Sequence, residues 1–103
     1  VNTQPKQFQL TLFSIFLLTE KGNNQIFTGD IFEVYKDLSA KVGLKPLTQR
    51  RISDIIAELD MMGMINAKVV SKGRYGRTRE ITLAIPGSTV PIIKQTLKEG
   101  LNL

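Results

Sequence analysis

Cysteine and histidine are both absent from the 103 residues of this sequence. Without cysteine the chain can form no disulfide and no thiolate metal site, which agrees with a reducing compartment. Without histidine it lacks the commonest general base and metal ligand, and histidine-dependent nucleophilic sites are excluded. The apolar run from Leu10 to Leu18 is interrupted by Thr11 and Ser14, is too short to span a bilayer, and lacks a signal-peptide cleavage pattern. We therefore expect no membrane partner and a cytoplasmic location.

Nucleotide-binding motifs are also missing. The sequence contains no G-x-x-x-x-G-K-[ST] phosphate loop and no G-x-G-x-x-G segment after a strand pattern. The carboxylates Asp30, Glu33 and Asp37 follow one predicted helix with Lys36 among them. That arrangement is typical of a solvated helix face rather than of an acid–base pair or a metal site. We expect no enzyme activity, no cofactor and no metal in this domain.

The sequence has an excess of basic residues, and this excess is concentrated in two short segments. The chain has 14 Lys and Arg against 9 Asp and Glu, a net charge of +5 and a pI of about 9.8. Seven of the basic residues lie close together in the sequence, at Arg50, Arg51, Lys68, Lys72, Arg74, Arg77 and Arg79. The rest of the chain holds 7 basic and 9 acidic residues, a net charge of −2. A slightly acidic body with two basic patches indicates a defined anionic partner.

The hydrophobic pattern predicts a single α+β domain over residues 1–103. Helical periodicity and turn residues predict helices at 8–20, 29–42, 48–62 and 91–101, with extended segments at 25–27, 67–71 and 81–85. The order is helix, short strand, helix, helix, strand, basic loop, strand, helix. This is the order of a winged helix-turn-helix domain built around a small antiparallel sheet, with the third helix in the recognition position.

Threonines and glycines mark the ends of the two central helices. Thr28 and Thr48 are the predicted N-caps, and Gly43 and Gly63 the predicted ends. The third helix has one apolar stripe, formed by Ile52, Ile55, Ile56, Leu59 and Met62. The opposite face carries Arg50, Ser53, Asp54, Ala57 and Met61. The helix is therefore amphipathic, with one face for the core and one for a ligand.

The first turns of this third helix have the chemistry of a DNA-reading helix. They carry Thr48, Gln49, Arg50, Arg51 and Ser53. Arginine can bond guanine and glutamine can bond adenine in the major groove, while the helix N-terminus favours phosphate. Later carboxylates, such as Asp54, would repel a DNA backbone, so we expect the N-terminal half to do the reading. A simpler interpretation also stays open, in which Arg50 pairs with Asp54 on a solvated face.

The loop between the two predicted hairpin strands is the second basic segment. It carries Lys72, Arg74, Arg77 and Arg79 around two glycines. Lysines on edge strands discourage aggregation, which accounts for Lys68 without any binding function. Three arginines in one short loop exceed that need, and narrow minor grooves attract inserted arginine. Tyr75 has three open roles: stacking, a sugar contact or packing back on the hairpin.

The joined helix and hairpin motif resembles a known family. The segments LTQRRISDIIAELDMMGMI (47–65) and AKVVSKGRYGRTREITL (67–83), with VYKDLSAKVGLKPL (34–47) before them, resemble the C-terminal winged-helix domain of archaeal Orc/Cdc-type replication initiators. The resemblance runs from about residue 7 to residue 101. It implies binding to double-stranded origin DNA, with the recognition helix in the major groove and the wing in the minor groove. It implies DNA contacts at Lys72, Gly73, Arg74, Tyr75, Gly76 and Arg77 in the loop, beside those of the helix.

The resemblance also implies what the full-length protein carries. Family members have an N-terminal AAA+ ATPase module that binds ATP and magnesium and takes part in helicase loading. We expect this chain to be excised from such a protein and to act on the nucleoid. Two alternatives stay open: a protein-interaction winged helix that contacts the replicative helicase or another initiator, and a winged-helix transcription regulator. Such regulators usually dimerise through added helices, and the short last helix here predicts a monomer.

Overall fold

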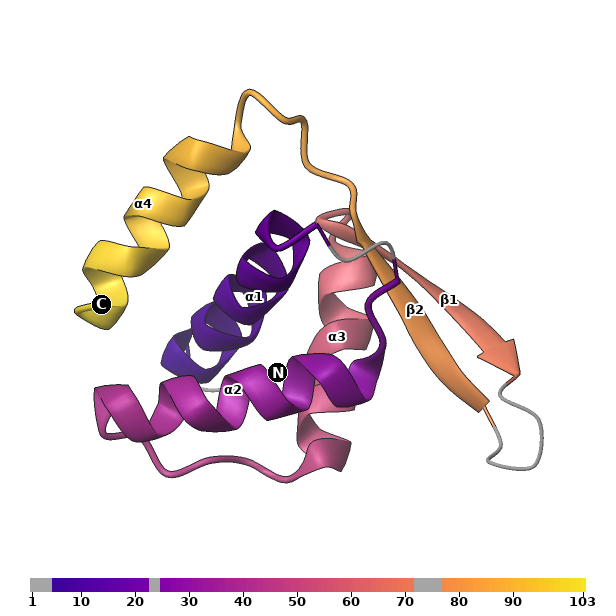
Figure 1. Cartoon of the computed structure of the whole chain (residues 1–103), viewed down its shortest axis with the longest axis horizontal. Coiled ribbons are helices and arrows are strands. Elements are labelled where there is room, and N and C mark those ends of the chain that lie inside the picture. Colours follow the sequence, from indigo (N-terminus) through magenta and orange to yellow (C-terminus); the bar gives the residue numbers. More distant parts are fainter. Residues whose placement is uncertain (1–4, 23–24, 72–76) are drawn as a thin grey trace.

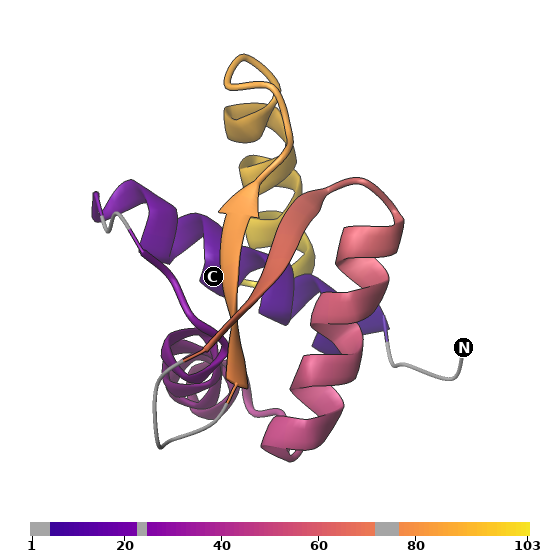
Figure 2. The same ribbon diagram turned by 90° about the vertical axis from the view of Figure 1, so that its right-hand side faces the viewer.

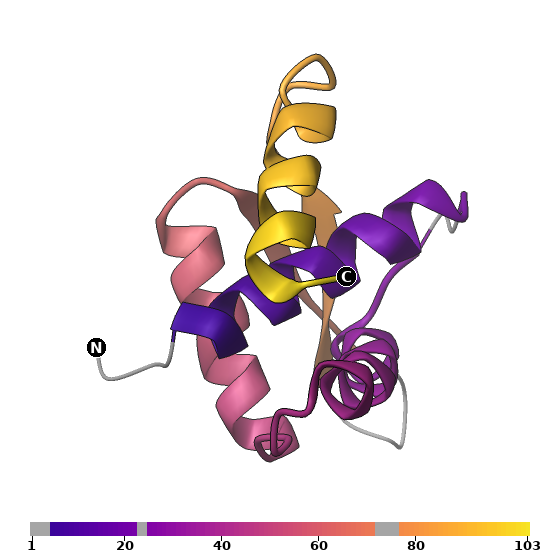
Figure 3. The same ribbon diagram turned by 90° about the vertical axis from the view of Figure 1, so that its left-hand side faces the viewer.

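The helices surround α1, and a two-stranded hairpin projects from one side of them (Figure 1). The computed structural model describes residues 5–22, 25–71 and 77–103. Its elements are α1 (Pro5–Glu20), α2 (Thr28–Val42), α3 (Gln49–Met61), β1 (Ile65–Ser71), β2 (Arg77–Leu83) and α4 (Val90–Leu101). Figure 2 shows the hairpin lying between α2 and α3, and Figure 3 shows α4 covering α1 on the side away from it. The winged helix-turn-helix architecture predicted from the sequence is confirmed.

Helix α1 is buried on all sides, as its nearly continuous apolar pattern predicts. It packs against α2, α3, α4 and β2. Two of its hydroxyl side chains are also buried, and they donate to carbonyl oxygens one turn earlier: Thr11 to Gln7 at 2.9 Å and Ser14 to Leu10 at 2.8 Å. The helix begins at Pro5 rather than at residue 8, because proline in the first turn loses no hydrogen bond there. In the described ranges no helix is long and apolar enough to cross a membrane.

The start of α2 corrects one predicted cap and one predicted strand. Phe27, not Thr28, is the N-cap residue, and its N–H donates to the Asp30 carboxylate at 3.0 Å. Phe27 stays extended because it bridges Glu80 of β2, while the N–H of Ile81 donates to the carbonyl oxygen of Ile26 at 2.7 Å. The short strand predicted at 25–27 is therefore only an isolated bridge. The predicted end at Gly43 is confirmed by its positive φ of 75°.

The hairpin strands begin and end at different residues from those predicted. The antiparallel register runs from Ile65 opposite Leu83 to Ser71 opposite Arg77. Strand β2 therefore starts four residues before the predicted 81, and Arg77 and Arg79 belong to a strand rather than to a loop. Cationic side chains do not prevent pairing, because the ladder is made by backbone groups. The other predicted loop residues, Lys72, Gly73, Arg74, Tyr75 and Gly76, lie outside the described residues.

The end of α3 corrects one residue of the predicted apolar stripe. Ile52, Ile55, Ile56 and Leu59 are buried, but Met62 is 60% exposed. The helix ends at Met61, and Gly63, with φ of 79°, turns the chain toward β1. The periodicity therefore stops before the last position of the stripe. Met61 is 86% exposed, as expected for the opposite face.

Candidate nucleic-acid interface

A buried hydrogen-bond network fixes the turn that leads into α3. Tyr35 of α2 is fully buried; its hydroxyl donates to Oε1 of Gln7 at 2.6 Å and accepts from the N–H of Leu47 at 2.6 Å. The amide nitrogen of Gln7 then donates to the carbonyl oxygen of Lys45 at 3.0 Å. Burial raises the pKa of Tyr35, and the hydrogen bond from Leu47 opposes that rise in part. The phenol is therefore neutral, and it links α1, α2 and the helix-turn-helix turn.

This network was not predicted from the sequence. Tyr35 shares the helical spacing of Ile31 and Leu38, which predicts a buried position, but this pattern identifies no partner for the hydroxyl. A tyrosine at an apolar stripe position was the available signal, because a buried phenol usually finds a hydrogen-bond partner.

The first turn of α3 presents the polar residues predicted to read DNA. The hydroxyl of Thr48 accepts from the N–H of Arg51 at 3.3 Å, which confirms the predicted cap. Thr48, Gln49, Arg50 and Arg51 are exposed and Ser53 is half-buried. Arg50 and Asp54 form no ion pair in the described part of the chain, and both side chains are exposed. The structure thus brings all five predicted helix residues to one end of α3.

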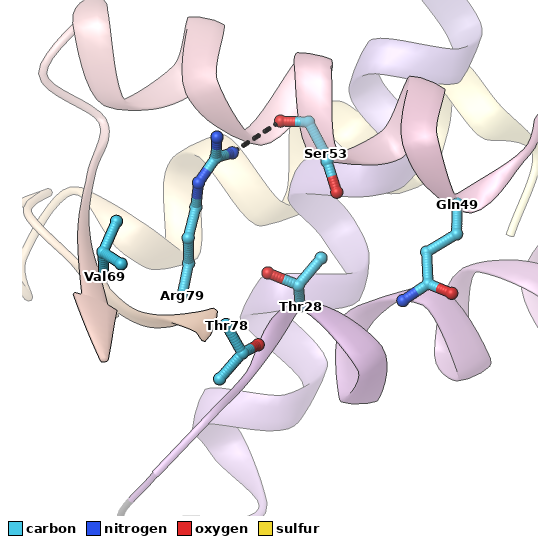
Figure 4. A pocket seen from close by; sticks show the side chains of 6 residues that line it. All are labelled: Thr28, Gln49, Ser53, Val69, Thr78 and Arg79. Atoms are coloured by element: carbon cyan, nitrogen blue, oxygen red, sulfur yellow. Dashed lines mark hydrogen bonds between the residues drawn. The ribbon is translucent and has the colours of Figure 1, made fainter. Parts of the chain in front are cut away.

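A polar groove separates this end of α3 from the hairpin. It has a volume of about 430 Å³ and is lined by Thr28, Gln49, Ser53, Val69, Thr78 and Arg79 (Figure 4). Gln49, Ser53 and Arg79 are among the residues predicted as DNA contacts; the other three were missed. The sequence held a usable signal for one of them, Val69, since residues paired across an antiparallel hairpin lie on the same face. Val69 stands directly opposite Arg79.

Arg79 is not a free cation of the loop. Its Nη1 donates to the carbonyl oxygen of Ser53 on α3 at 2.9 Å, and its side chain is half-buried in the groove (Figure 4). Arg79 was predicted to lie in the loop, but it lies in β2. Its contact with DNA stays a prediction. The sequence alternation Arg79, Ile81, Leu83 was a signal for this inward position.

Charge is unevenly distributed along α3. Exposed Arg50 and Arg51 lie at its start, and Asp54 and Asp60 lie further along. Asp60 is engaged with the protein itself, because its carboxylate accepts from the N–H of Ala67 at 3.3 Å. The described residues contain no group of His, Cys, Asp and Glu that could hold a metal ion. The positive charge of α3 therefore lies in its first turn, next to Gln49, which lines the groove.

Helix α2, the capped helix α3 and the hairpin beside it define a winged helix-turn-helix domain. The model of the CDC6 C-terminal winged helix domain matches residues 1–91, and the chain belongs to this family.

The chain is similar to archaeal DNA replication proteins. The chain is 56% identical over 85 residues to an ORC1-type DNA replication protein of Pyrococcus furiosus, covering 82% of this chain and 20% of that protein. It is 52% identical over 86 residues to ORC1-type DNA replication protein 4 of Haloarcula marismortui, covering 84% of this chain and 16% of that protein. The chain thus spans a fifth or less of the length of these relatives.

A solved structure shares the fold. The Aeropyrum pernix Orc1 protein, determined in complex with DNA, superposes with a TM-score of 0.81 and 43% identity, covering 93% of this chain and 24% of that protein. The fold class and the family resemblance read from the sequence are therefore confirmed.

Proposed function

We propose that this chain binds double-stranded origin DNA as the C-terminal module of a replication initiator. In this proposal the N-terminal half of α3 enters the major groove and the hairpin follows the minor groove. The observation that supports it most is the polar groove, which sets Gln49 and Ser53 of α3 beside Val69, Thr78 and Arg79 of the hairpin. A B-DNA major groove is about 12 Å wide and admits one helix. With α3 in the major groove and the hairpin in the minor groove, the phosphate backbone between them would lie over the polar groove of the protein.

Two further observations support the proposal. The basic residues of the chain are concentrated on α3 and the hairpin, whereas the remaining residues carry a small net negative charge. The Aeropyrum pernix Orc1 protein, which shares the fold at 43% identity, was solved in complex with DNA. In the full-length protein we expect ATP and magnesium on a separate ATPase module, the helicase or another initiator as protein partners, and a place on the nucleoid. The domain itself is proposed to be non-catalytic.

Chemical-shift mapping with duplex DNA tests this function. Titration with a duplex carrying the preferred site, selected from a randomised pool, should shift the amides of residues 48–53, 69 and 78–79. The amides around Lys41 and Leu101, which line a small pocket between helix ends away from the hairpin, should not move. With five to seven phosphate contacts, log K should fall with log salt at a slope of roughly −5 to −6. No binding to any duplex at low salt would refute DNA binding and favour a protein-interaction module.

Gln49 tests which elements read sequence. Gln49 is exposed and lines the groove, where its amide can bond a base edge. Replacing Gln49 with alanine should reduce discrimination at one base pair by about 1–3 kcal/mol, with the salt slope unchanged. Competition binding with the preferred site and its single-base variants measures this. The matched control is Gln95→Ala on α4, an exposed glutamine bonded to Glu99. Equal preference profiles for the two variants would remove Gln49 from base reading.

A further inference from the structure

Arg79 joins the two elements that the proposed function places on DNA. Its side chain crosses the groove from β2 and donates to the backbone carbonyl of Ser53 on α3 at 2.9 Å (Figure 4). A guanidinium is planar and has five N–H donors in a fixed fork, so one bond orients the group and leaves other donors available. We infer that Arg79 is a positioning residue, which holds the hairpin at a set distance and angle from the recognition helix.

The position of Arg79 on β2 explains why a clasp is needed there. Arg79 lies on the same face of β2 as Ile81, which is only 1% exposed. Directly opposite it, Val69 of β1 is 56% exposed. Apolar packing on the inward face therefore ends between Ile81 and Arg79, where the hairpin leaves the body. Beyond Ile81, the hydrogen bond from Arg79 to Ser53 holds the hairpin to α3 in place of apolar packing.

The backbone does little to hold β2 against α3. Strand β1 packs along α3, whereas β2 packs mainly against β1, α1 and α2. A two-stranded hairpin is only marginally stable without support from other elements. The Arg79 side chain spans this gap, so it restricts how far the outer hairpin can swing relative to α3. Ser53 contributes a main-chain atom, which means that the clasp does not depend on the side chain at position 53.

Fixing this angle matters because two grooves must be entered together. If the hairpin and α3 are held in one arrangement, the contact of one brings the other into register without a further ordering cost. Loosening the hairpin would let it reach phosphates in many orientations, with Gln49 and Arg50 no longer in phase with the bases. Since this consequence rests on the proposed function, Arg79 is expected to govern sequence preference more than affinity for DNA in general.

Three variants separate a clasp from a plain phosphate contact. Arg79→Gln removes the charge and cannot span the groove; Arg79→Lys keeps the charge without the planar fork; Arg77→Gln removes the same charge two residues further out on β2. Binding is measured with the preferred and a scrambled duplex over a range of salt, at a temperature where each variant is folded. Residual dipolar couplings of the DNA-free proteins report the angle between the hairpin and α3.

The clasp predicts a distinct result for each variant. Arg79→Gln should reduce the ratio of preferred to scrambled affinity by about 10-fold, the scale of one misplaced base contact. Arg79→Lys should keep the salt slope of the parent but show the same reduced ratio. Arg77→Gln should weaken both duplexes alike and reduce the salt slope by about 1. In the DNA-free proteins, the hairpin angle should change in the Arg79 variants and stay unchanged in Arg77→Gln.

The inference fails if Arg79→Gln behaves like Arg77→Gln in both ratio and slope, with the hairpin angle of the free protein unchanged. If Arg79→Gln does not fold, Arg79→Lys carries the same ratio and angle measurements. Failure of the proposed function would give a different result, because neither the parent protein nor any variant would bind either duplex. The dipolar couplings would still decide whether Arg79 sets the hairpin angle.

Discussion

Reversing the charge of Arg74 and Arg77 together should reduce the affinity for duplex DNA by about 100-fold at 0.1 M salt, since each lost phosphate contact removes nearly a factor of ten there. The loss should be the same for preferred and scrambled duplexes, because phosphate contacts position a protein without reading sequence. The salt slope should become shallower by about 2. Fluorescence anisotropy at several salt concentrations measures all three quantities. We expect this to be the largest effect on binding of any pair of substitutions in the hairpin.

A matched control separates a local contact from net charge. Lys6 and Lys41 are exposed and line a small pocket with Leu101, between the ends of α1, α2 and α4, on the side of the molecule away from the hairpin (Figure 1). Reversing both lysines changes the net charge by the same amount. This control should weaken binding only slightly at 0.1 M salt, where the Debye length is about 10 Å. Equal losses in the two double variants would show that the hairpin makes no particular contact.

Replacing Tyr35 with phenylalanine should lower the free energy of unfolding by about 1–3 kcal/mol, the scale for a buried polar group left without its partner. The substitution removes the hydroxyl that links Gln7 to the N–H of Leu47. The ring itself keeps its packing, so the loss reports the hydrogen bonds. Urea unfolding followed by circular dichroism measures it. The control is Thr11→Val, which removes another buried hydroxyl, but one that bonds only within its own helix. If Thr11→Val lowers the free energy of unfolding by as much as Tyr35→Phe, the network has no special role.

The same network gives a pH dependence. Burial raises the pKa of Tyr35 above its usual 10, so the unfolded chain loses this proton at a lower pH than the folded protein does. The contribution of the neutral phenol to stability is complete below pH 10 and declines as the pH rises through the folded pKa. The stability difference between the parent and Tyr35→Phe should therefore be constant from pH 7 to 9 and shrink above pH 10. A difference that stays constant up to pH 11 would contradict a buried neutral phenol.

The helices were predictable from sequence because their signals are local. Periodicity predicts the buried faces of α1 and α3. The residue types at the helix ends predict the cap at Thr48 and the end at Gly43. The cap of α2 was misplaced by one residue, because Phe27 is held extended by Glu80, a residue more than fifty positions away. No local pattern contains that contact.

Some residues of the candidate site were predictable, but its geometry was not. Composition and motif placed Gln49, Arg50 and Arg51 at the start of the recognition helix, where the structure has them. Arg79 was assigned by its charge to a loop, since the strand register that turns it toward Ser53 depends on pairing with β1. The groove residues Thr28 and Thr78 were missed for a related reason, because only the packing of α2 against β2 brings them together.

Three hydrogen bonds that hold α3 and the turn before it end on main-chain atoms of that segment. Gln7 and Tyr35 hold the backbone of Lys45 and Leu47, and Arg79 holds the backbone of Ser53. The side chains of Gln49, Arg50 and Arg51 take no part in these three hydrogen bonds. Exchanging Gln49, Arg50 and Arg51 for other residues would therefore leave the helix where it is. If the domain binds DNA as proposed, it can acquire a new target sequence by changing these few surface positions, with its framework unchanged.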